Sequence, residues 1–292
     1  MLTPGLTLAM IVKNEERNLV RCLDSVRDLV RELIVVDTGS ADRTPQIAAD
    51  YGAKIIPFDF RVVDFAAARN YAIAQATSRW ILMLDADETL DRTSIPLLGQ
   101  ILASGERDGH YLERRNFASD SALPTTDYCV RLFPNLPRYR YSGRVHETID
   151  ASILAAGARL RQSGIRIDHH FAADREARRR KNRWYIEILQ EEIAADPSDG
   201  TRLDFLAAEY HQLEMFAEAT RVTERIVQMR PRDARARLFL GAYRLLYQPD
   251  LARARAELNE ALRLRPGYPE AQSFLQLLDE HEGRPNQSGS VG

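Results

Sequence analysis

The first 90 residues alternate between short apolar runs and stretches in which apolar residues recur at helical spacing. Strands are predicted at residues 6–12, 33–36, 54–57 and 80–84. The runs at 33–36 and 80–84 are wholly apolar and are typical of strands buried on both faces. Strands that alternate with helices of about 10–15 residues form βαβ units. The pattern therefore predicts an α/β fold with a parallel sheet.

Local signals mark where two of the helices begin. Asn14 follows the first strand and is expected to cap a helix, with Glu15 and Glu16 favourably placed in the first turn. Thr44-Pro45 places proline at the first position of the next helix. We therefore expect each helix to begin shortly after the strand that precedes it.

The carboxyl-terminal part of the chain is helical and repetitive. Amphipathic helices precede Pro197, Pro231 and Pro266, which are spaced by 34 and 35 residues. A period near 34 residues, with proline after the second helix of each pair, is the signature of tetratricopeptide repeats. We therefore expect a helical-repeat region after the α/β domain.

The composition is that of an ordinary globular protein with no bias toward nucleic acid. Of 292 residues, 45% are hydrophobic and 28% charged, and 40 basic side chains nearly balance 42 acidic ones. A nucleic-acid binder would show a basic domain or stripe. No run approaches the ~20 apolar residues of a transmembrane segment, and residues 1–10 lack the pattern of a secretory signal. Cys22 and Cys129 lie in apolar segments and are interpreted as reduced, so a cytoplasmic location is expected.

The acidic cluster at residues 85–88 carries the strongest chemical signal. Asp85 and Asp87 follow the fourth strand two residues apart, so in an extended chain they point the same way. Parallel sheets bind ligands at the carboxyl ends of their strands. Two carboxylates there suit a hard divalent cation that carries phosphates. The alternative is a solvated acidic turn, and Glu88 is interpreted as a supporting carboxylate.

Two other polar loops are expected at the same edge of the sheet. Residues 13–16 follow the first strand and residues 37–40 follow the second. Their convergence with the acidic cluster indicates a nucleotide site. The glycine-rich signatures of dinucleotide-binding and P-loop proteins are absent from the sequence, so a different nucleotide-binding fold is needed.

Five motifs occur in the order found in family 2 glycosyltransferases, which the chain resembles over residues 5–171. They are Lys13-Asn14-Glu15-Glu16, Asp37-Thr-Gly-Ser40, Asp64-Phe-Ala-Ala-Ala-Arg69-Asn70, Leu84-Asp85-Ala-Asp87-Glu88 and Gly143-Arg144-Val145-His146-Glu147. The last is similar to a motif of a bacterial branch that includes the peptide S-glycosyltransferases of glycocin biosynthesis. The resemblance implies the GT-A fold, a Rossmann-like nucleotide-diphospho-sugar transferase domain.

Pattern and resemblance together divide the chain into three parts. A catalytic domain is expected at residues 1–171 and a tetratricopeptide-like helical region at residues 172–282. Residues 283–292 are rich in glycine, serine and proline and are expected to be disordered.

The resemblance also implies roles for individual residues on the donor side. Asp37 would hydrogen-bond the nucleotide base, typically uracil, in a donor site to which Lys13 and Glu15 also contribute. Arg69 would reach the nucleotide and its phosphates. Asp85 would lie close to the ribose and the metal, and Asp87 would be the main metal ligand.

Two further roles complete the implied site. Glu147 occupies the place of the catalytic carboxylate on the acceptor side. A histidine near the end of the domain often joins the metal or the diphosphate, and the sequence offers His169 and His170. Many relatives have histidine, an apolar residue, glycine and an aromatic residue here. Because this chain lacks that glycine, either histidine could be equivalent, and we favour His169.

The implied activity is an inverting transfer of sugar from a nucleotide donor, with Mg²⁺ or Mn²⁺, to a peptide, protein or glycan. A sugar-nucleotide pyrophosphorylase-like enzyme is one alternative, although its glycine-rich loop after the first strand is missing. A non-catalytic scaffold that binds peptides through its repeats is another. Residues 174–280 are expected to bind the acceptor or a partner protein; a structural support or a surface for homodimer formation is the alternative.

Overall fold

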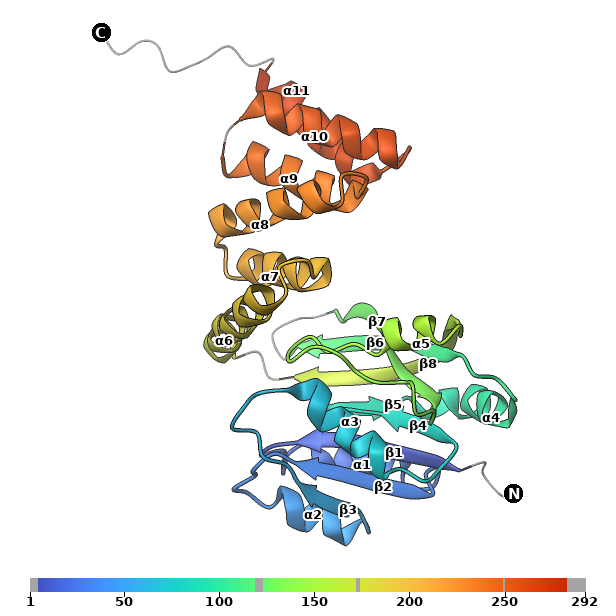
Figure 1. Cartoon of the computed structure of the whole chain (residues 1–292). Helices are drawn as coiled ribbons and strands as arrows, with labels where there is room; N and C mark the ends of the chain where they lie inside the picture. The colour runs from blue at the N-terminus through green and yellow to red at the C-terminus, as the bar shows by residue number, and fades with distance from the viewer. Residues whose placement is uncertain (1–4, 119–122, 172–173, 249, 283–292) are drawn as a thin grey trace. The chain divides into compact units, whose positions relative to one another are not determined.

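A computed structural model describes residues 5–118, 123–171, 174–248 and 250–282 (Figure 1). The chain divides into two compact units, Met1–Asp174 and Arg175–Gly292. Each unit is described by itself below. The tail expected to be disordered, residues 283–292, lies outside the described residues.

Eight strands form one mixed sheet in the first unit, in the spatial order β3-β2-β1-β4-β7-β6-β8-β5 (Figure 1). They are β1 (Leu6–Val12), β2 (Glu32–Asp37), β3 (Lys54–Pro57), β4 (Trp80–Met83), β5 (Glu88–Leu90), β6 (Gly109–Ala118), β7 (Thr125–Pro134) and β8 (Leu160–Phe171). Strands β1 to β4 are parallel, as the hydrophobic pattern predicts, whereas β7 pairs with β4 in the antiparallel direction. The α/β fold with a parallel sheet is confirmed for this half.

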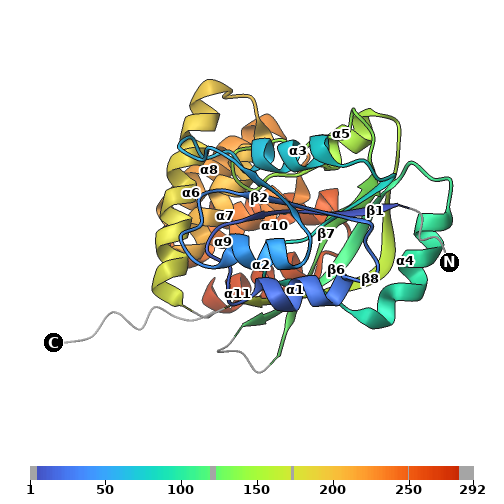
Figure 2. The same ribbon diagram turned by 90° about the horizontal axis from the view of Figure 1, so that it is seen from below.

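Helices cover both faces of the parallel half (Figure 2). The helices of this unit are α1 (Leu19–Val26), α2 (Thr44–Asp50), α3 (Phe65–Gln75), α4 (Ile95–Ala103) and α5 (Asp150–Ala155), with a short 3₁₀ turn η1 (Arg92–Ser94). On one face, Leu8 and Met10 of β1 belong to the same buried cluster as Leu19 of α1. On the other face, Ala9 clusters with Ala72 of α3. Burial on both faces explains why β1 is apolar at nearly every position.

The loop after β1 differs from the sequence-based prediction. Helix α1 begins only at Leu19, and Asn14 does not cap it. Instead, Asn14 has a φ of 57°, its Oδ1 accepts a hydrogen bond from the N–H of Ala41 at 2.8 Å, and its own N–H donates to Ser40 Oγ at 3.0 Å. Asparagine tolerates the left-handed region better than most residues. Asn14 therefore ties the loop after β1 to the loop after β2.

The segment after Asp87 forms a strand where local sequence predicts only a polar loop. This strand, β5, pairs antiparallel with β8, so that Glu88 lies opposite His169. The N–H of His170 also donates to the carbonyl of Asp87 at 3.0 Å. This pairing places the acidic cluster beside the histidines at the end of the domain.

Six consecutive helices make up the described part of the second unit. They are α6 (Arg175–Ala195), α7 (Gly200–Gln212), α8 (Phe216–Met229), α9 (Ala234–Leu246), α10 (Leu251–Leu264) and α11 (Pro269–Glu282). Asp199 caps α7 and Asp233 caps α9, each by accepting hydrogen bonds from two N–H groups of the first turn. The two caps are spaced like the prolines. The predicted tetratricopeptide-like helices are therefore confirmed.

Gly241 sets the distance between α9 and α10. A Cβ at this position would lie 2.7 Å from Cγ of Leu258 and 3.2 Å from the carbonyl oxygen of Ala254. We expect Gly241→Ala to lower the free energy of unfolding of this unit by about 1–3 kcal/mol through overpacking. That loss exceeds the gain of at most about 1 kcal/mol from helix propensity. Calorimetric unfolding of both proteins measures the difference.

Gly99 provides the matched control for this substitution. It is exposed on α4, and a Cβ there would meet nothing within 4 Å. Gly99→Ala should therefore raise the free energy of unfolding by roughly 0.5–1 kcal/mol. If Gly241→Ala stabilised the protein as much as Gly99→Ala does, close packing of α9 on α10 would be refuted.

His110 is a buried histidine that predicts a dependence of stability on pH. It is 2% exposed, and neither ring nitrogen has a hydrogen-bond partner within the described part of the chain. Burial lowers the pKa of His110 below 6.5, although the charges of Glu106 and Asp108 act to raise it and that of Arg161 acts to lower it. Below pH 6.5 the unfolded chain therefore binds a proton that the folded protein excludes.

We expect the folded protein to lose stability through His110 as the pH falls from about 7.5 to 5. The slope that one such group contributes is at most about 1.4 kcal/mol per pH unit. His110→Leu removes this group, so wild-type and variant stabilities should diverge over this pH range in favour of the variant. Urea unfolding at each pH measures both proteins, and parallel curves would contradict the prediction.

Candidate active site

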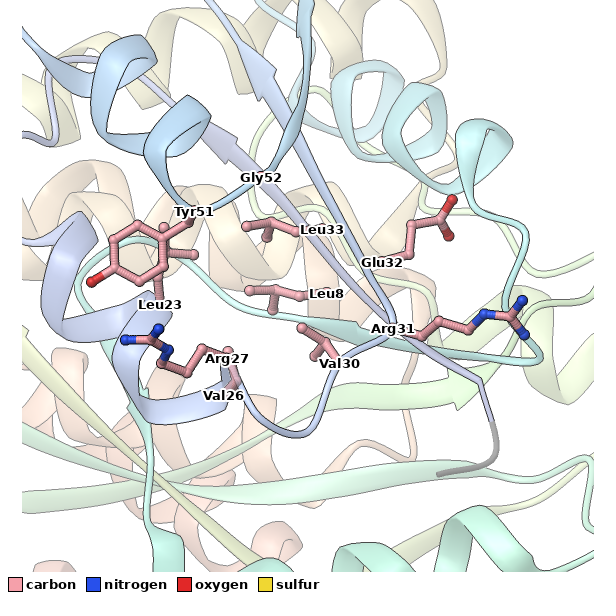
Figure 3. Close-up of a pocket in the computed structure, with 10 residues that line it drawn as sticks. All are labelled: Leu8, Leu23, Val26, Arg27, Val30, Arg31, Glu32, Leu33, Tyr51 and Gly52. Atoms are coloured by element: carbon pink, nitrogen blue, oxygen red, sulfur yellow. The ribbon is translucent and has the colours of Figure 1, made fainter. Parts of the chain in front are cut away.

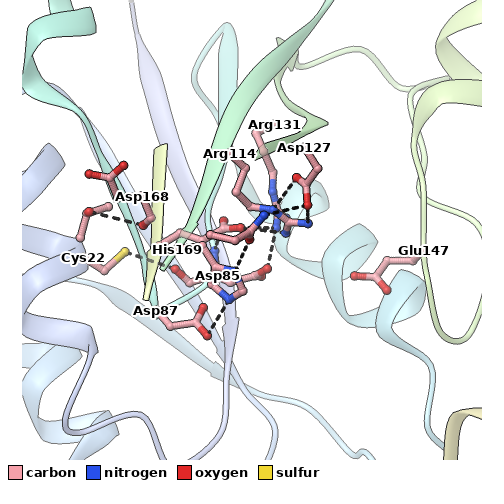
Figure 4. A network of polar contacts seen from close by, with 12 residues as sticks. Cys22, Asp85, Asp87, Arg114, Asp127, Arg131, Glu147, Asp168 and His169 are labelled. Carbon is pink, nitrogen blue, oxygen red and sulfur yellow. Dashed lines mark hydrogen bonds and ion pairs between the residues drawn. The ribbon is translucent and has the colours of Figure 1, made fainter. Parts of the chain in front are cut away.

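The candidate active site lies where β4 ends, near the middle of the sheet. Asp85 and Asp87 follow β4, while Arg69 comes from α3. Arg131 lies on β7, and Glu147 lies in the loop that precedes α5. Figure 4 shows Asp85 beside Arg131 of β7, with Asp87 on the side of His169. The sheet thus gathers residues that are far apart in sequence.

Two buried arginines hold the carboxylate of Asp85. Arg69 Nη2 donates to Oδ1 at 2.8 Å, and Arg131 Nη2 donates to Oδ2 at 2.6 Å. Burial by itself raises the pKa of Asp85, but the charges of Arg131 and Arg69 outweigh it and hold that pKa well below its usual range. The carboxylate is therefore held in its ionised form.

Arg69 also contacts Glu147. Its Nε donates to Oε1 of Glu147 at 2.6 Å, and the glutamate side chain is 12% exposed. Burial acts to lower the pKa of Arg69, whereas the charges of Asp85 and Glu147 raise it above its ordinary value. One guanidinium thus joins the carboxylate of Asp85, after β4, to the carboxylate of Glu147, for which the resemblance implies an acceptor-side role.

The loop that carries Glu147 is held in place by α3. Residues 142–148 are closed by an antiparallel bridge. Next to that bridge, Asn70 accepts a hydrogen bond from the N–H of Tyr141 at 2.8 Å and donates to its carbonyl at 2.9 Å. Asn70 directly follows Arg69. This adjacent pair on α3 therefore fixes both the loop and its carboxylate.

Glu88 is completely buried and supports Asp85 from behind. Its Oε2 accepts the N–H of Asp85 at 3.0 Å. Its Oε1 accepts hydrogen bonds from Arg131 at 2.8 Å and from Arg114 at 3.3 Å. Sequence analysis did not identify either arginine. The signal that could have revealed Arg131 is a charged residue between Val130 and Leu132 in an apolar strand, because charges are rarely buried without a partner.

Asp87 and His169 lie together on the other side of Asp85 (Figure 4). Oδ2 of Asp87 is 3.2 Å from Nε2 of His169, and Nδ1 of the same ring is 2.8 Å from Oδ1 of Asn116. The amide of Asn116 donates through Nδ2 to Asp127, at 3.0 Å. Its Oδ1 must therefore accept, so the proton of a neutral His169 ring is on Nδ1.

His170 has a different environment. Its ring stacks on Phe117 with a centroid separation of 5.1 Å, and burial lowers its pKa. Of the two histidines that the sequence offers, His169 is the one whose ring contacts the carboxylate of Asp87.

The donor atoms of Asp87 and His169 suit a divalent cation that takes most of its ligands from a diphosphate. Their separation of 3.2 Å is close to that of adjacent ligands around an octahedral ion with bonds of about 2.1 Å. Asp85 is instead directed to Arg69 and Arg131. Within the described ranges, no three His, Cys, Asp or Glu side chains are grouped as a metal site.

The remaining predicted donor-site residues lie at the same edge of the sheet. Asp37 ends β2, and its carboxylate accepts hydrogen bonds from the N–H groups of Gly39 and Ser40. Burial raises the pKa of Glu15, a hydrogen bond from Asn18 acts to lower it, and the charges of Asp87 and Asp85 raise it further.

Lys13 is exposed. No hydrogen bond or ion pair between described residues joins Lys13 or Asp37 to the arginines of the site. The structure therefore connects Arg69, Asp85 and Glu147 directly, whereas Lys13 and Asp37 lie outside this network of described contacts.

A separate surface pocket lies between α1, α2 and the amino ends of β1 and β2 (Figure 3). Apolar side chains such as Leu8 and Val26 line it, with Arg27, Arg31 and Glu32 at its margin. It lies at the opposite end of the parallel strands from Asp85. Its lining contains no grouping of catalytic side chains, and we assign it no role.

Comparison with known proteins identifies the family. The model of glycosyl transferase family 2 matches residues 7–178. The glycosyltransferase SunS of Bacillus subtilis is 26% identical over 234 residues, covering 74% of this chain and 52% of the relative. A TPR repeat-containing protein of Synechococcus elongatus is 45% identical over 149 residues, covering 51% of this chain and 36% of the relative. The chain thus spans about half or less of the length of these relatives.

A solved structure supports the fold. The crystal structure of S. aureus TarS residues 1–349 in complex with UDP-GlcNAc matches with a TM-score of 0.54 and 13% identity, covering 95% of this chain and 91% of that chain. At this identity the likeness concerns the fold alone. Because the family model covers more than half of the chain, the protein belongs to glycosyl transferase family 2, with a GT-A fold followed by tetratricopeptide-like helices.

Proposed function

We propose that this protein is a metal-dependent, inverting glycosyltransferase that uses a nucleotide sugar, most simply a UDP-sugar. One observation carries the proposal: Arg69 contacts both Asp85 and Glu147. The carboxylate on the donor side and the carboxylate on the acceptor side are thereby fixed relative to each other, as a single displacement between two substrates requires.

The departure of the nucleotide diphosphate is the step that needs positive charge. Mg²⁺ or Mn²⁺, held by Asp87 and His169 near Asp85, would act as a Lewis acid on the diphosphate. Arg69 is 5% exposed, and its guanidinium is engaged by Asp85 and Glu147, so it would act on the same anion through its charge and not by direct contact. Its burial strengthens this interaction because water does not screen it.

Glu147 is placed to receive the proton of the acceptor. Arg69 holds its Oε1, and in the described part of the chain Oε1 is the only oxygen of Glu147 that accepts a hydrogen bond. The carboxylate is thereby oriented, with Oε2 available as the basic atom. A positioned general base typically accelerates such a reaction about 10²–10⁴-fold. Attack from the face opposite the leaving group would invert the configuration of the sugar.

We further propose that the acceptor is a peptide or protein and that the helices of residues 174–280 help to bind it. Stacked helix pairs of the tetratricopeptide type form concave surfaces suited to extended chains. Resemblance to peptide S-glycosyltransferases and similarity to SunS support this choice. No described helix is long and apolar enough to cross a membrane.

A nucleotide-sugar screen tests the activity. Each donor is added with and without Mn²⁺, and melting temperature and donor hydrolysis are recorded. A true donor must raise the melting temperature by mass action, since it binds only the folded protein. Hydrolysis of one donor class that depends on Mn²⁺ supports the proposal. Binding and turnover of none would refute it, and formation of a nucleotide sugar with release of inorganic diphosphate from a nucleoside triphosphate and a sugar 1-phosphate would indicate a pyrophosphorylase.

A further inference from the structure

Asp85 is held by a closed ring of hydrogen bonds that includes its backbone as well as its side chain. Its N–H donates to Oε2 of Glu88 at 3.0 Å. The other oxygen of Glu88 accepts from Arg131 Nη2 at 2.8 Å, and the same Nη2 donates to Oδ2 of Asp85 at 2.6 Å. The ring therefore fixes both where Asp85 leaves β4 and where its carboxylate points.

The two other members of this ring are inaccessible to a substrate. Glu88 is 0% exposed and Arg131 is 6% exposed. Nε of Arg131 is likewise buried and has no hydrogen-bond partner within the described residues. A ligand at the surface could therefore meet Asp85 but neither of the residues behind it. Their effect on a reaction must pass through Asp85.

Stability alone is a poor reason for this arrangement. Burying charged groups carries a desolvation cost that their mutual attraction often fails to exceed. An apolar residue would also suit this strand, because Val130 and Leu132, which flank Arg131, are buried. The presence of arginine in spite of the desolvation cost is explained if its contacts with Asp85 and Glu88 matter for function more than for stability.

We propose that Arg131 and Glu88 are positioning residues that hold Asp85 in its functional geometry. The inference rests on the proposed glycosyl transfer and deepens it. Arg131, on β7, neutralises and orients the carboxylate of Asp85. Glu88 fixes the backbone of Asp85 by accepting its N–H. Arg69 then completes the link from Asp85 to Glu147.

Two substitutions break the ring in different ways. Glu88→Gln has nearly the same shape but only one acceptor oxygen, so it cannot accept from both Asp85 and Arg131. Arg131→Met removes the guanidinium, and Arg131→Lys keeps a positive charge. We expect Glu88→Gln and Arg131→Met to lower kcat/KM for donor turnover about 100-fold, the cost of a misplaced functional group. Arg131→Lys should recover part of this loss.

Arg115→Met is the matched control. Arg115 lies on the adjacent strand β6 and also bridges two carboxylates, Asp91 and Asp168, but it does not contact Asp85. Its loss should lower the melting temperature without changing kcat/KM. If Arg131 and Glu88 were merely structural, their variants would behave like Arg115→Met, with reduced melting temperatures and unchanged kcat/KM. That result would overturn the inference.

Crystal structures of the wild-type protein and Glu88→Gln provide a measurement that needs no activity. We expect Asp85 to change its side-chain direction in the variant, while Arg69 and Glu147 remain paired. An unmoved Asp85 would overturn the inference. If wild-type protein turns over no nucleotide sugar, the proposed function fails, but the position of Asp85 in the variant still decides this inference. Should Arg131→Met not fold, Glu88→Gln and Arg131→Lys carry the test.

Discussion

Glu147→Gln is expected to reduce sugar transfer by about 10² or more while leaving donor affinity near that of the wild-type protein. The amide oxygen of glutamine can still accept the hydrogen bond that Arg69 Nε now donates to Oε1. The loop of residues 142–148 is also held independently, by Asn70 and by its antiparallel bridge. The substitution therefore keeps the shape and the hydrogen bond of the side chain, while it removes the proton acceptor and one negative charge beside Arg69. Steady-state kinetics with saturating donor, together with calorimetric titration of the nucleotide, measure the two quantities.

Glu32→Gln is the appropriate control for this experiment. Glu32 is a partly buried carboxylate in the same unit, which accepts hydrogen bonds from Thr7 and Thr77. It begins β2 and so lies at the opposite end of the strands from Glu147. We expect it to affect stability and not transfer. If Glu147→Gln abolished donor binding while transfer of residual bound donor stayed normal, Glu147 would belong to the donor site and its assignment as the base would be wrong.

Asp87→Ala is expected to abolish Mn²⁺-dependent nucleotide binding and turnover without unfolding the protein. Asp87 lies between β4 and β5, and its side chain is 28% exposed. Its carbonyl, which accepts the N–H of His170, is retained in the variant. The substitution thus leaves the backbone pairing intact and deletes the carboxylate beside His169 Nε2. Titration of the nucleotide at several Mn²⁺ concentrations measures the effect.

Asp28→Ala controls for the loss of an aspartate at the surface of the same unit. Asp28 pairs with Arg92 and is 55% exposed, far from the acidic cluster in sequence. This variant should bind nucleotide and respond to Mn²⁺ as the wild-type protein does. Normal Mn²⁺-dependent turnover by Asp87→Ala would show that the metal is held elsewhere or is not required.

The parallel half of the sheet could be predicted because its signals are local. An apolar run followed by Asp85 and Asp87 indicates, within a few residues, a strand that is buried on both faces and ends in polar residues. The period of the prolines similarly predicts the helix pairs of the second unit. Resemblance to a family then suggested Glu147 and His169, which periodicity does not distinguish from other polar residues.

Asn14 shows why local reasoning fails in the loops. Its residue type and its place before two glutamates are typical of a helix cap. The structure uses its side chain for Ala41 instead, because β1 and β2 are neighbours and bring their following loops together. Long-range pairing thus outweighed a local preference.

By itself, the sequence determined the class of the fold, the helical repeats and the acidic strand end, since each depends on residues that are neighbours along the chain. Only the tertiary structure decided that Arg69 joins Asp85 to Glu147, that Arg131 and Glu88 hold Asp85, and that the ring of His169, and not that of His170, contacts the carboxylate of Asp87. Those contacts depend on the order and register of β5, β7 and β8. A shift of one residue in register turns each side chain to the other face of the sheet, so these contacts follow from strand pairing that no local pattern encodes.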